Sequence, residues 1–261
     1  MDENNLIINL EDVSFRYPGR PPTLDKLSLQ FQQGDRMGLM GSNGSGKTTL
    51  FHIIMGLLKP SSGKIEIFGR PLKEEKDFRI VRQRIGFLFQ DADDQLFSPT
   101  VLEDVAFGPL NLGKSQHEAK TIARTTLDSL GLAGFEDRIT YKLSGGEKRL
   151  VSLATVLAME PEVLLLDEPS TGLDETTENK TIDILKNLNL SYIVVSHNID
   201  FLLETTGYIE CMASGKIIVD DKRIPHSHVH VHKYGRYAHK HGPAWAEKRK
   251  KGNSYTVKLK R

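Results

Sequence analysis

Short apolar segments separated by turns recur along the first 220 residues of the chain. Several are continuous apolar runs, as in Arg36-Met-Gly-Leu-Met40 and Val163-Leu-Leu-Leu166. Continuous runs are typical of strands that are buried on both faces of a parallel sheet. The pattern predicts strands over residues 6–17, Leu27–Phe31, Arg36–Met40, Ile65–Phe68, Ile85–Phe89, Val163–Leu166, Tyr192–Val195 and Ile217–Val219.

Between Asp91 and Met159 the pattern becomes mostly helical, as in Ser115–Leu130 and Glu147–Met159. The simplest interpretation is an α/β fold in which a helical insert interrupts a parallel core. We expect one domain over residues 1–221, with the helical subdomain at about 91–160, and a C-terminal extension over residues 222–261.

The charge of the chain differs sharply between these two parts. The net charge is +1, but residues 222–261 contain twelve Lys or Arg and one acid, Glu247, which gives +11 there and leaves −10 on residues 1–221. The extension is therefore a basic, His-rich tail that is separate from the body. A solvated tail without a partner is one interpretation of it.

Cysteine usage and the N-terminus bear on where the protein works. The single cysteine, Cys211, excludes an intramolecular disulfide and fits a reducing cytosol. We expect no signal peptide, because the first residues are polar, and no run approaches the roughly 18 to 20 apolar residues of a membrane helix. Any role at a membrane would then require a partner.

A glycine-rich segment follows the predicted strand at 36–40 and precedes a helix predicted from about Lys47 to Leu57. It matches the P-loop pattern of glycine, four residues, and then Gly-Lys-Ser/Thr. Glycines let successive backbone N–H groups point at phosphate oxygens, and the positive end of the following helix adds to this. Lys47 would bridge the phosphates and Thr48 would bind Mg²⁺. The candidate nucleotide ligands are Gly41, Ser42, Asn43, Gly44, Ser45, Gly46, Lys47, Thr48 and Thr49.

Two acids, Asp167 and Glu168, end the apolar run at 163–166. At the carboxyl end of a parallel strand their side chains face the ligand crevice. We expect Asp167 to hold the Mg²⁺ shell and Glu168 to polarise the attacking water. A solvated pair of acids at a strand end is the alternative for either residue taken alone.

Further motifs resemble those of one family, the ATP-binding-cassette (ABC) ATPases, in the family's order. Leu143-Ser-Gly-Gly-Glu147 resembles the signature motif and Ser170-Thr-Gly-Leu-Asp174 the D-loop. Gln90 resembles the Q-loop glutamine, His197 the switch histidine, and Tyr17 the aromatic residue that stacks on adenine. The resemblance covers residues 6 to about 220. It implies a P-loop NTPase fold with a RecA-like parallel core, N-terminal antiparallel strands and a helical subdomain insert.

The resemblance also implies a mechanism, with ATP and Mg²⁺ as the bound groups. Two copies, identical or different, would face each other head to tail. Ser144, Gly145 and Gly146 of one copy, at a helix starting near Glu147, would cap the ATP held by the other. His197 would contact the γ-phosphate and Gln90 would sense Mg²⁺ and water, while Asp174 would link the two sites. Glu147 departs from the family pattern, in which many members have Gln.

The segment Phe89–Val101, together with residues 103–109 after it, resembles one branch of this family, the ATPases of energy-coupling-factor (ECF) importers. In that branch the segment forms a groove for the coupling helices of a transmembrane subunit. Gln95, Leu96 and Phe97 are the candidate contacts, and Leu96 and Phe97 would then be exposed in the lone subunit. The alternative is that they belong to the core of the helical insert.

Histidines in the tail point to the transported substrate. His226, His228, His230 and His232 alternate with other residues, so an extended chain would place them on one face. Neutral imidazoles suit Ni²⁺, Co²⁺, Zn²⁺ and Cu²⁺, and the resemblance is to cobalt and nickel ECF importers. Incidental metal affinity is the alternative. The basic residues at 248–251, with Lys258, Lys260 and Arg261, could lie against anionic lipid.

The predicted function is therefore an ATPase subunit at the cytoplasmic face of the cell membrane. It would drive uptake, of cobalt or nickel ions, through a transmembrane coupling subunit and a substrate-binding membrane subunit. Vitamin uptake by an ECF importer is the alternative within the class. A non-transport ABC ATPase of DNA repair or translation is the alternative outside it, although the chain has no heptad arms and only one cassette. We expect no nucleic acid partner, because the tail has little aromatic interleaving.

Overall fold

The computed structural model describes residues 5–218, 229–230 and 239–240. The chain forms two compact units, residues 1–218, called the body below, and residues 219–261. In the second unit, β11 (Val229–His230) and β12 (His239–Lys240) pair antiparallel, with His230 opposite His239. In the described part of the chain, no helix is long and apolar enough to cross a bilayer.

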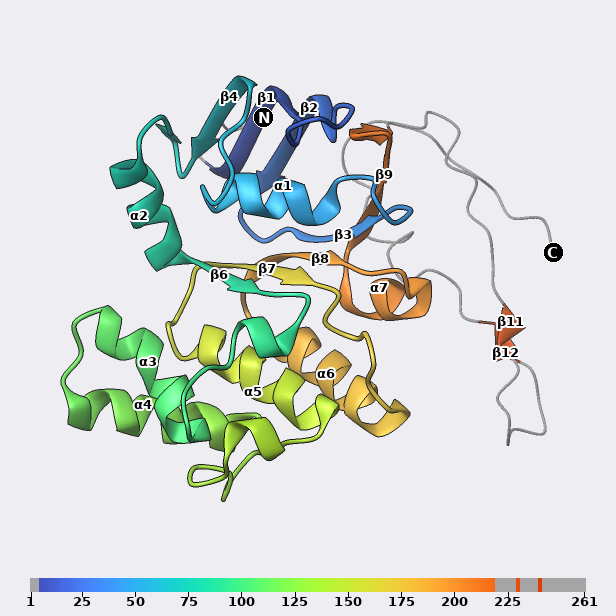
Figure 1. Cartoon of the computed structure of the whole chain (residues 1–261). Helices are drawn as coiled ribbons and strands as arrows, with labels where there is room; N and C mark the ends of the chain where they lie inside the picture. Colours follow the sequence, from blue (N-terminus) through green and yellow to red (C-terminus); the bar gives the residue numbers. More distant parts are fainter. Residues whose placement is uncertain (1–4, 219–228, 231–238, 241–261) are drawn as a thin grey trace. The chain divides into compact units, whose positions relative to one another are not determined.

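The strands of the body, over residues 5–218, form a four-stranded and a six-stranded sheet (Figure 1). The N-terminal sheet is antiparallel, in the order β2-β1-β4-β5, with β1 Leu6–Phe15, β2 Leu24–Gln32, β4 Ser62–Ile67 and β5 Arg70–Pro71. The central sheet has the order β10-β9-β3-β8-β7-β6, and β9, β3, β8, β7 and β6 run parallel. Its strands are β3 Arg36–Met40, β6 Ile85–Leu88, β7 Val163–Asp167, β8 Ser191–Val195, β9 Tyr208–Ala213 and β10 Lys216–Ile218.

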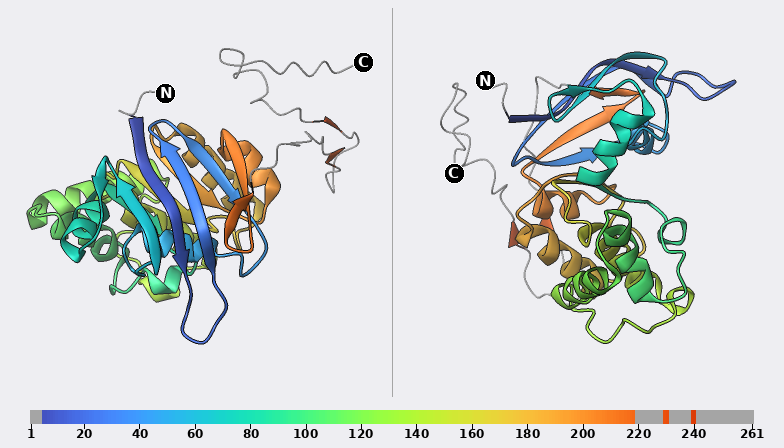
Figure 2. Two further views of the ribbon diagram at one scale, coloured as in Figure 1. Left: turned by 90° about the horizontal axis from the view of Figure 1, so that it is seen from above. Right: turned by 90° about the vertical axis from the view of Figure 1, so that its left-hand side faces the viewer.

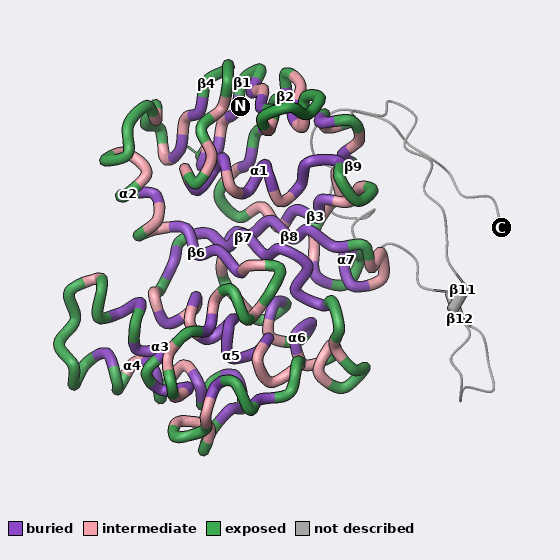
Figure 3. Tube along the Cα trace, in the orientation of Figure 1, coloured by how far each residue is buried: buried purple, intermediate pink, exposed green. Residues whose placement is uncertain are grey.

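The central sheet is covered on both faces, which explains the continuous apolar runs of its strands. In β7, Val163 and Leu165 pack into a core with α1 (Lys47–Ile54) and the N-terminal sheet. Leu164 and Leu166, which point to the other face, pack into a second core with α5 (Gly145–Leu157), α6 (Glu175–Asn187) and α7 (Ile199–Thr205). Figure 3 shows the buried trace of β6, β7 and β8 between these layers. The expected parallel core is therefore confirmed.

The helical part of the body has a core of its own. Its elements are α3 (Val101–Asn111), α4 (Gln116–Ser129) and α5, with the short 3-10 helices η2 (Ala92–Asp94) and η3 (Thr140–Lys142). Leucine, valine and alanine residues from these helices form one buried cluster. Figure 2 shows these helices gathered on the side of the central sheet that faces away from the N-terminal strands.

The observed boundaries differ from the predicted ones in ways that matter for the site. β1 ends at Phe15, so Tyr17 lies in the loop after it. The helix α5 begins at Gly145, with Ser144 as its N-cap, rather than near Glu147. The strand β9 and the helix α2 (Glu75–Arg84) lie where the hydrophobic pattern gave no prediction, and β9 pairs directly with β3 beside the glycine loop.

Candidate functional site

The glycine loop between β3 and α1 can form only because glycine occupies three of its positions. Gly44 and Gly46 have φ angles of 79° and 108°, in the left-handed region that other residues rarely adopt. A Cβ atom on Gly41 would lie 2.2 Å from the carbonyl oxygen of Met212 in β9. The loop therefore curls tightly against the end of the central sheet.

The first turn of α1 is suited to binding phosphate. Its N-cap, Gly46, makes no side-chain cap, so within the described residues no side chain occupies the N–H groups at this helix end. Lys47 donates hydrogen bonds from Nζ to the carbonyl oxygens of Gly41, at 2.7 Å, and Ser42, at 3.1 Å. Burial lowers the pKa of the Lys47 ammonium, whereas the nearby Glu168 and Asp167 raise it.

Asp167, the last residue of β7, is a buried acid with unsatisfied oxygens. It is 1% exposed, and neither carboxylate oxygen accepts a hydrogen bond of good geometry within the described residues. Burial raises the pKa of Asp167, while the hydroxyl of Thr48 is close enough to lower it. A buried carboxylate without partners is costly unless a cation completes it. Asp167 and Thr48 therefore fit a Mg²⁺ ion.

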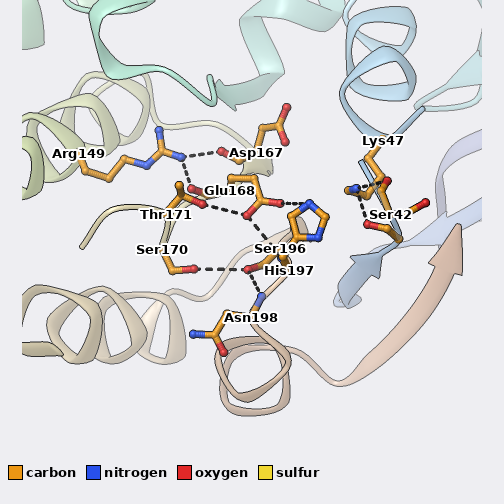
Figure 4. Close-up of polar contacts among 11 residues, drawn as sticks. Ser42, Lys47, Arg149, Asp167, Glu168, Ser170, Thr171, Ser196, His197 and Asn198 are labelled. Atoms are coloured by element: carbon orange, nitrogen blue, oxygen red, sulfur yellow. Dashed lines mark hydrogen bonds and ion pairs between the residues drawn. The ribbon is translucent and has the colours of Figure 1, made fainter. Parts of the chain in front are cut away.

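Glu168 follows in a strained conformation, with a φ angle of 51°. Its Oε2 accepts hydrogen bonds from the hydroxyl of Thr171 at 3.0 Å and from the backbone N–H of His197 at 3.4 Å. Its Oε1 lies 3.3 Å from Nε2 of His197. Figure 4 shows the carboxylate of Glu168 between the side chains of Thr171 and His197. The structure thus brings together Lys47, Asp167, Glu168 and His197 from three separate segments.

A buried arginine, Arg149 of α5, holds this region together. It is 5% exposed and donates hydrogen bonds to five backbone carbonyls. The acceptors belong to Phe89, Gln90, Asp167, Glu168 and Pro169. Burial lowers the pKa of Arg149 to about 10, and the neighbouring acids oppose this shift. Arg149 therefore joins the segment of Gln90 to the two acids.

Tyr17 and Gln90 lie at the edges of this cluster. The hydroxyl of Tyr17 is 3.3 Å from that of Thr49 in α1, and its ring contacts Phe15 edge to face. Gln90 is exposed, just after β6, and is tied to the site through its own carbonyl and Arg149. Ser42, Asn43 and Gly44 are exposed on the glycine loop, while the hydroxyl of Ser45 is buried without a partner among the described residues.

Ser144, Gly145 and Gly146 form the N-terminus of α5, and none of them joins the cluster around Lys47 in the interactions of the described residues. Ser144 caps the helix by accepting from the N–H of Glu147, whose carboxylate accepts from the N–H of Ser144 at 2.8 Å. Glu147 also pairs with Arg138 at 2.8 Å, which neutralises the unusual acid of this motif. Asp174 caps α6, where the N–H and hydroxyl of Thr177 bond to its carboxylate and lower its pKa.

The expected exposure of Leu96 is wrong. Leu96 is 8% exposed because it packs into the core of the helical part. Gln95 is also used internally, since its amide donates to the carbonyl of Ser152 and the hydroxyl of Thr155, each at 2.8 Å. Phe97 is exposed as expected, at 66%, and its ring contacts the exposed ring of Phe107.

Two residues of the site were missed at the sequence level: Arg149 and Thr171. Arg149 directly follows Glu147 and Lys148, so its neighbours in the sequence give no signal that it is buried. Thr171 gives no signal of its own, because its contact with Glu168 depends on the turn between them. The tail histidines His226, His228 and His232 lie outside the described residues, as do residues 248–261, and the side chain of His230 is not described.

The known proteins that resemble this chain include ATP-binding proteins of ABC transporters. A family model described as ABC transporter matches residues 24–171. A putative ABC transporter ATP-binding protein of Nitratidesulfovibrio vulgaris is 50% identical over 238 residues, which cover 91% of this chain and 87% of that protein. The energy-coupling factor transporter ATP-binding protein EcfA of Methanothermobacter thermautotrophicus is 41% identical over 218 residues, 82% of this chain and 70% of that protein.

Among solved structures, CbiO1 of Clostridium perfringens, part of the ABC transporter complex CbiONQ, has a TM-score of 0.73 and 34% identity. The match covers 82% of this chain and 88% of that one.

Proposed function

Because this chain belongs to the family of ABC transporter ATP-binding proteins, we propose that it powers an ECF-type importer of cobalt or nickel ions. As a member of that family it binds Mg·ATP and hydrolyses it. The finer roles of its residues and the identity of its substrate are our inference. The observation that supports them best is the buried carboxylate of Asp167, which accepts no hydrogen bond of good geometry from the described residues and, like Glu168, lies near the phosphate-loop lysine.

In this proposal the nucleotide lies between the glycine loop and the acids. Mg²⁺, when bound, neutralises charge on the phosphates, and Thr48, Asp167 and Gln90 are the residues that would hold it. Lys47 and the N-terminus of α1 bind phosphate oxygens. Glu168 accepts a proton from the attacking water. His197 follows β8, and its Nε2 lies 3.3 Å from the carboxylate of Glu168. It would therefore contact the γ-phosphate close to the attacking water.

The second half of each ATP site comes from another ABC ATPase, identical or different. Ser144, Gly145 and Gly146 lie at the start of α5, where the helix dipole favours a phosphate, yet no interaction among the described residues joins them to the cluster around Lys47 of their own subunit. In a head-to-tail dimer, these three residues of one subunit would lie against the ATP that the glycine loop of the other subunit holds. ATP then closes the dimer and hydrolysis releases it, which gives the membrane partner two states to follow.

We propose that the exposed rings of Phe97 and Phe107 receive the transmembrane coupling subunit. A hollow of about 300 Å³ lies beside Phe97, which lines it together with Pro99, Tyr141 and others. Tyr141 is strongly exposed as well. Aromatic side chains exposed around a hollow are typical of a surface that a partner covers. This contact would hold the chain at the cytoplasmic face of the membrane.

The catalytic part of the proposal is tested by Glu168→Gln. This variant should bind ATP, lose steady-state turnover, and remain as an ATP-bound dimer in size-exclusion chromatography. Retained turnover would remove Glu168 from the role of general base. Lys47→Ala is the companion variant, because it should fail at the earlier step of nucleotide binding.

The substrate is tested by tracer uptake of Ni²⁺, Co²⁺ and a panel of vitamins in cells with and without the chain. Loss of Ni²⁺ or Co²⁺ uptake alone supports the metal importer. Loss of vitamin uptake keeps the ECF function and rejects the metal. Deletion of residues 224–261 then tests the tail, since Ni²⁺ binding that is unchanged in calorimetry would exclude the tail histidines as metal ligands.

A further inference from the structure

The two oxygens of the Glu168 carboxylate have different surroundings. Oε2 accepts two hydrogen bonds, from the hydroxyl of Thr171 and from the backbone N–H of His197. Oε1 is buried and lies 3.3 Å from Nε2 of His197, but it accepts no hydrogen bond of good geometry from the described residues. Its lone pairs are therefore the ones left to interact with a bound molecule.

Backbone contacts hold the hydroxyl of Thr171 against Oε2 of Glu168. The N–H of Thr171 donates to the carbonyl of Glu168 at 3.2 Å, which closes a turn over residues 168–171. The left-handed φ angle of Glu168 starts this turn. Arg149 holds the carbonyls of Glu168 and Pro169 within it. A β-branched side chain such as threonine also has few rotamers, so its hydroxyl direction is well defined.

A general base needs one oxygen directed at the water and a carboxylate that does not rotate. We propose that Thr171 is a positioning residue that occupies Oε2 of Glu168, so that Oε1 is the oxygen that accepts the proton from the attacking water. This inference rests on the proposed role of Glu168 and adds which oxygen acts and what holds it. Thr171 itself touches no reacting atom in this scheme.

The test compares Thr171→Val with Thr171→Ser in the full-length chain. Valine keeps the shape and removes the hydroxyl, while serine keeps the hydroxyl. Because the lost hydrogen bond is to a charged group, we expect kcat for ATP to fall about 10-fold or more in Thr171→Val. The KM for ATP should change less than about 2-fold, because ground-state binding does not use this contact. Thr171→Ser should stay within about 3-fold of the unchanged chain.

A double-variant cycle separates positioning from a structural effect. In a Glu168→Gln background, adding Thr171→Val should leave the residual single-turnover rate unchanged, because the carboxylate that Thr171 positions is already absent. Thermal unfolding of each variant, followed by circular dichroism, shows whether the turn is intact.

Three results would overturn the inference. They are a kcat for Thr171→Val within about 2-fold of the unchanged chain, an equal fall in Thr171→Ser, and a further fall in the Glu168→Gln background. Failure of the proposed function looks different, because Glu168→Gln would then retain turnover. A Thr171→Val variant of normal activity beside an inactive Glu168→Gln variant would reject only the role of Thr171.

Discussion

Replacing Asp167 with asparagine should make the nucleotide-free protein more stable while removing its function. The carboxylate is 1% exposed and lacks hydrogen-bond partners of good geometry in the described residues. An unsatisfied buried polar group costs about 1 to 3 kcal/mol, and a charged one costs more. The hydroxyl of Thr48 and the charge of Arg149 offset part of that cost. We therefore expect the neutral amide to gain about 1 to 2 kcal/mol, or about 2 to 8 °C in Tm for a body of this size.

The pKa of Asp167 sets the direction of the pH dependence. Burial raises this pKa above the usual value of 3.8. The folded protein thus holds the proton to higher pH than the unfolded chain does, so stability falls as the pH rises through the interval between the two pKa values. The full cost is present above the raised pKa. The advantage of Asp167→Asn should therefore be largest at neutral pH and should shrink as the pH approaches the usual aspartate value.

Asp104 in α3 provides a matched control with the opposite sign. It is also buried, but its Oδ1 accepts from the N–H groups of Phe97 and Ser98, and its Oδ2 from the hydroxyl of Thr140. Asp104→Asn replaces these charge-assisted bonds with neutral ones, which should lower stability by about 1 to 2 kcal/mol. Both variants change one carboxylate to an amide of the same shape.

The assay is thermal unfolding by circular dichroism, with and without Mg·ATP. Without nucleotide, Asp167→Asn should unfold above the unchanged chain and Asp104→Asn below it. With Mg·ATP, the unchanged chain and Asp104→Asn should gain stability, and Asp167→Asn should gain much less. If Asp167→Asn unfolded below the unchanged chain at pH 7 without nucleotide, the carboxylate would be satisfied by the protein itself. Asp167 would then not need a metal to satisfy its charge.

Three further predictions concern the loop, the buried arginine and the partner surface. Gly41→Ala should lose nucleotide affinity, measured with a fluorescent ATP analogue, because its Cβ would meet the carbonyl of Met212 at 2.2 Å; normal affinity would show that the loop can shift. Arg149→Met should cost about 3 kcal/mol or more in urea unfolding, since it removes the donor from five backbone carbonyls, three of which take part in buried hydrogen bonds. An unchanged midpoint would refute this. Leu96→Ala should lower the free energy of unfolding by about 2 to 3 kcal/mol, because Leu96 lies in the core of the helical part. Phe97→Ala should lower it by less than about 1 kcal/mol and should instead reduce copurification of the membrane partner. Equal losses of stability in the two variants would contradict the assignment of Leu96 to the core and of Phe97 to the partner surface.

The phosphate loop and the buried strands of the parallel core could be predicted because their signals are local. A glycine that must adopt a positive φ angle, or that must lie against another backbone, can be recognised from spacing alone, and Gly44 and Gly46 have that conformation. The continuous apolar run of β7 likewise reflects burial on both faces, which the two cores flanking it confirm. Strand β9 was not predicted, because one acid, Glu210, interrupts its short apolar run.

Leu96 and Phe97 show where sequence reasoning must fail. They are adjacent apolar residues with the same local pattern, yet one enters the core of the helical part and the other stays exposed beside Phe107. Only the direction in which each side chain leaves the segment after η2 separates them. That direction follows from the packing of this segment on α5, where the amide of Gln95 is anchored.

By itself, the sequence determined the chemistry of this protein: a loop that binds phosphate, two acids at a strand end, and the motifs of an ABC ATPase. Those features depend on residues that are neighbours along the chain. The tertiary structure decided how the acids are used. Arg149 reaches carbonyls of segments that are distant in sequence, and a turn brings Thr171 back onto Glu168. Such contacts exist only after the helices pack on the sheet, since packing sets the directions of donors and acceptors that spacing leaves open.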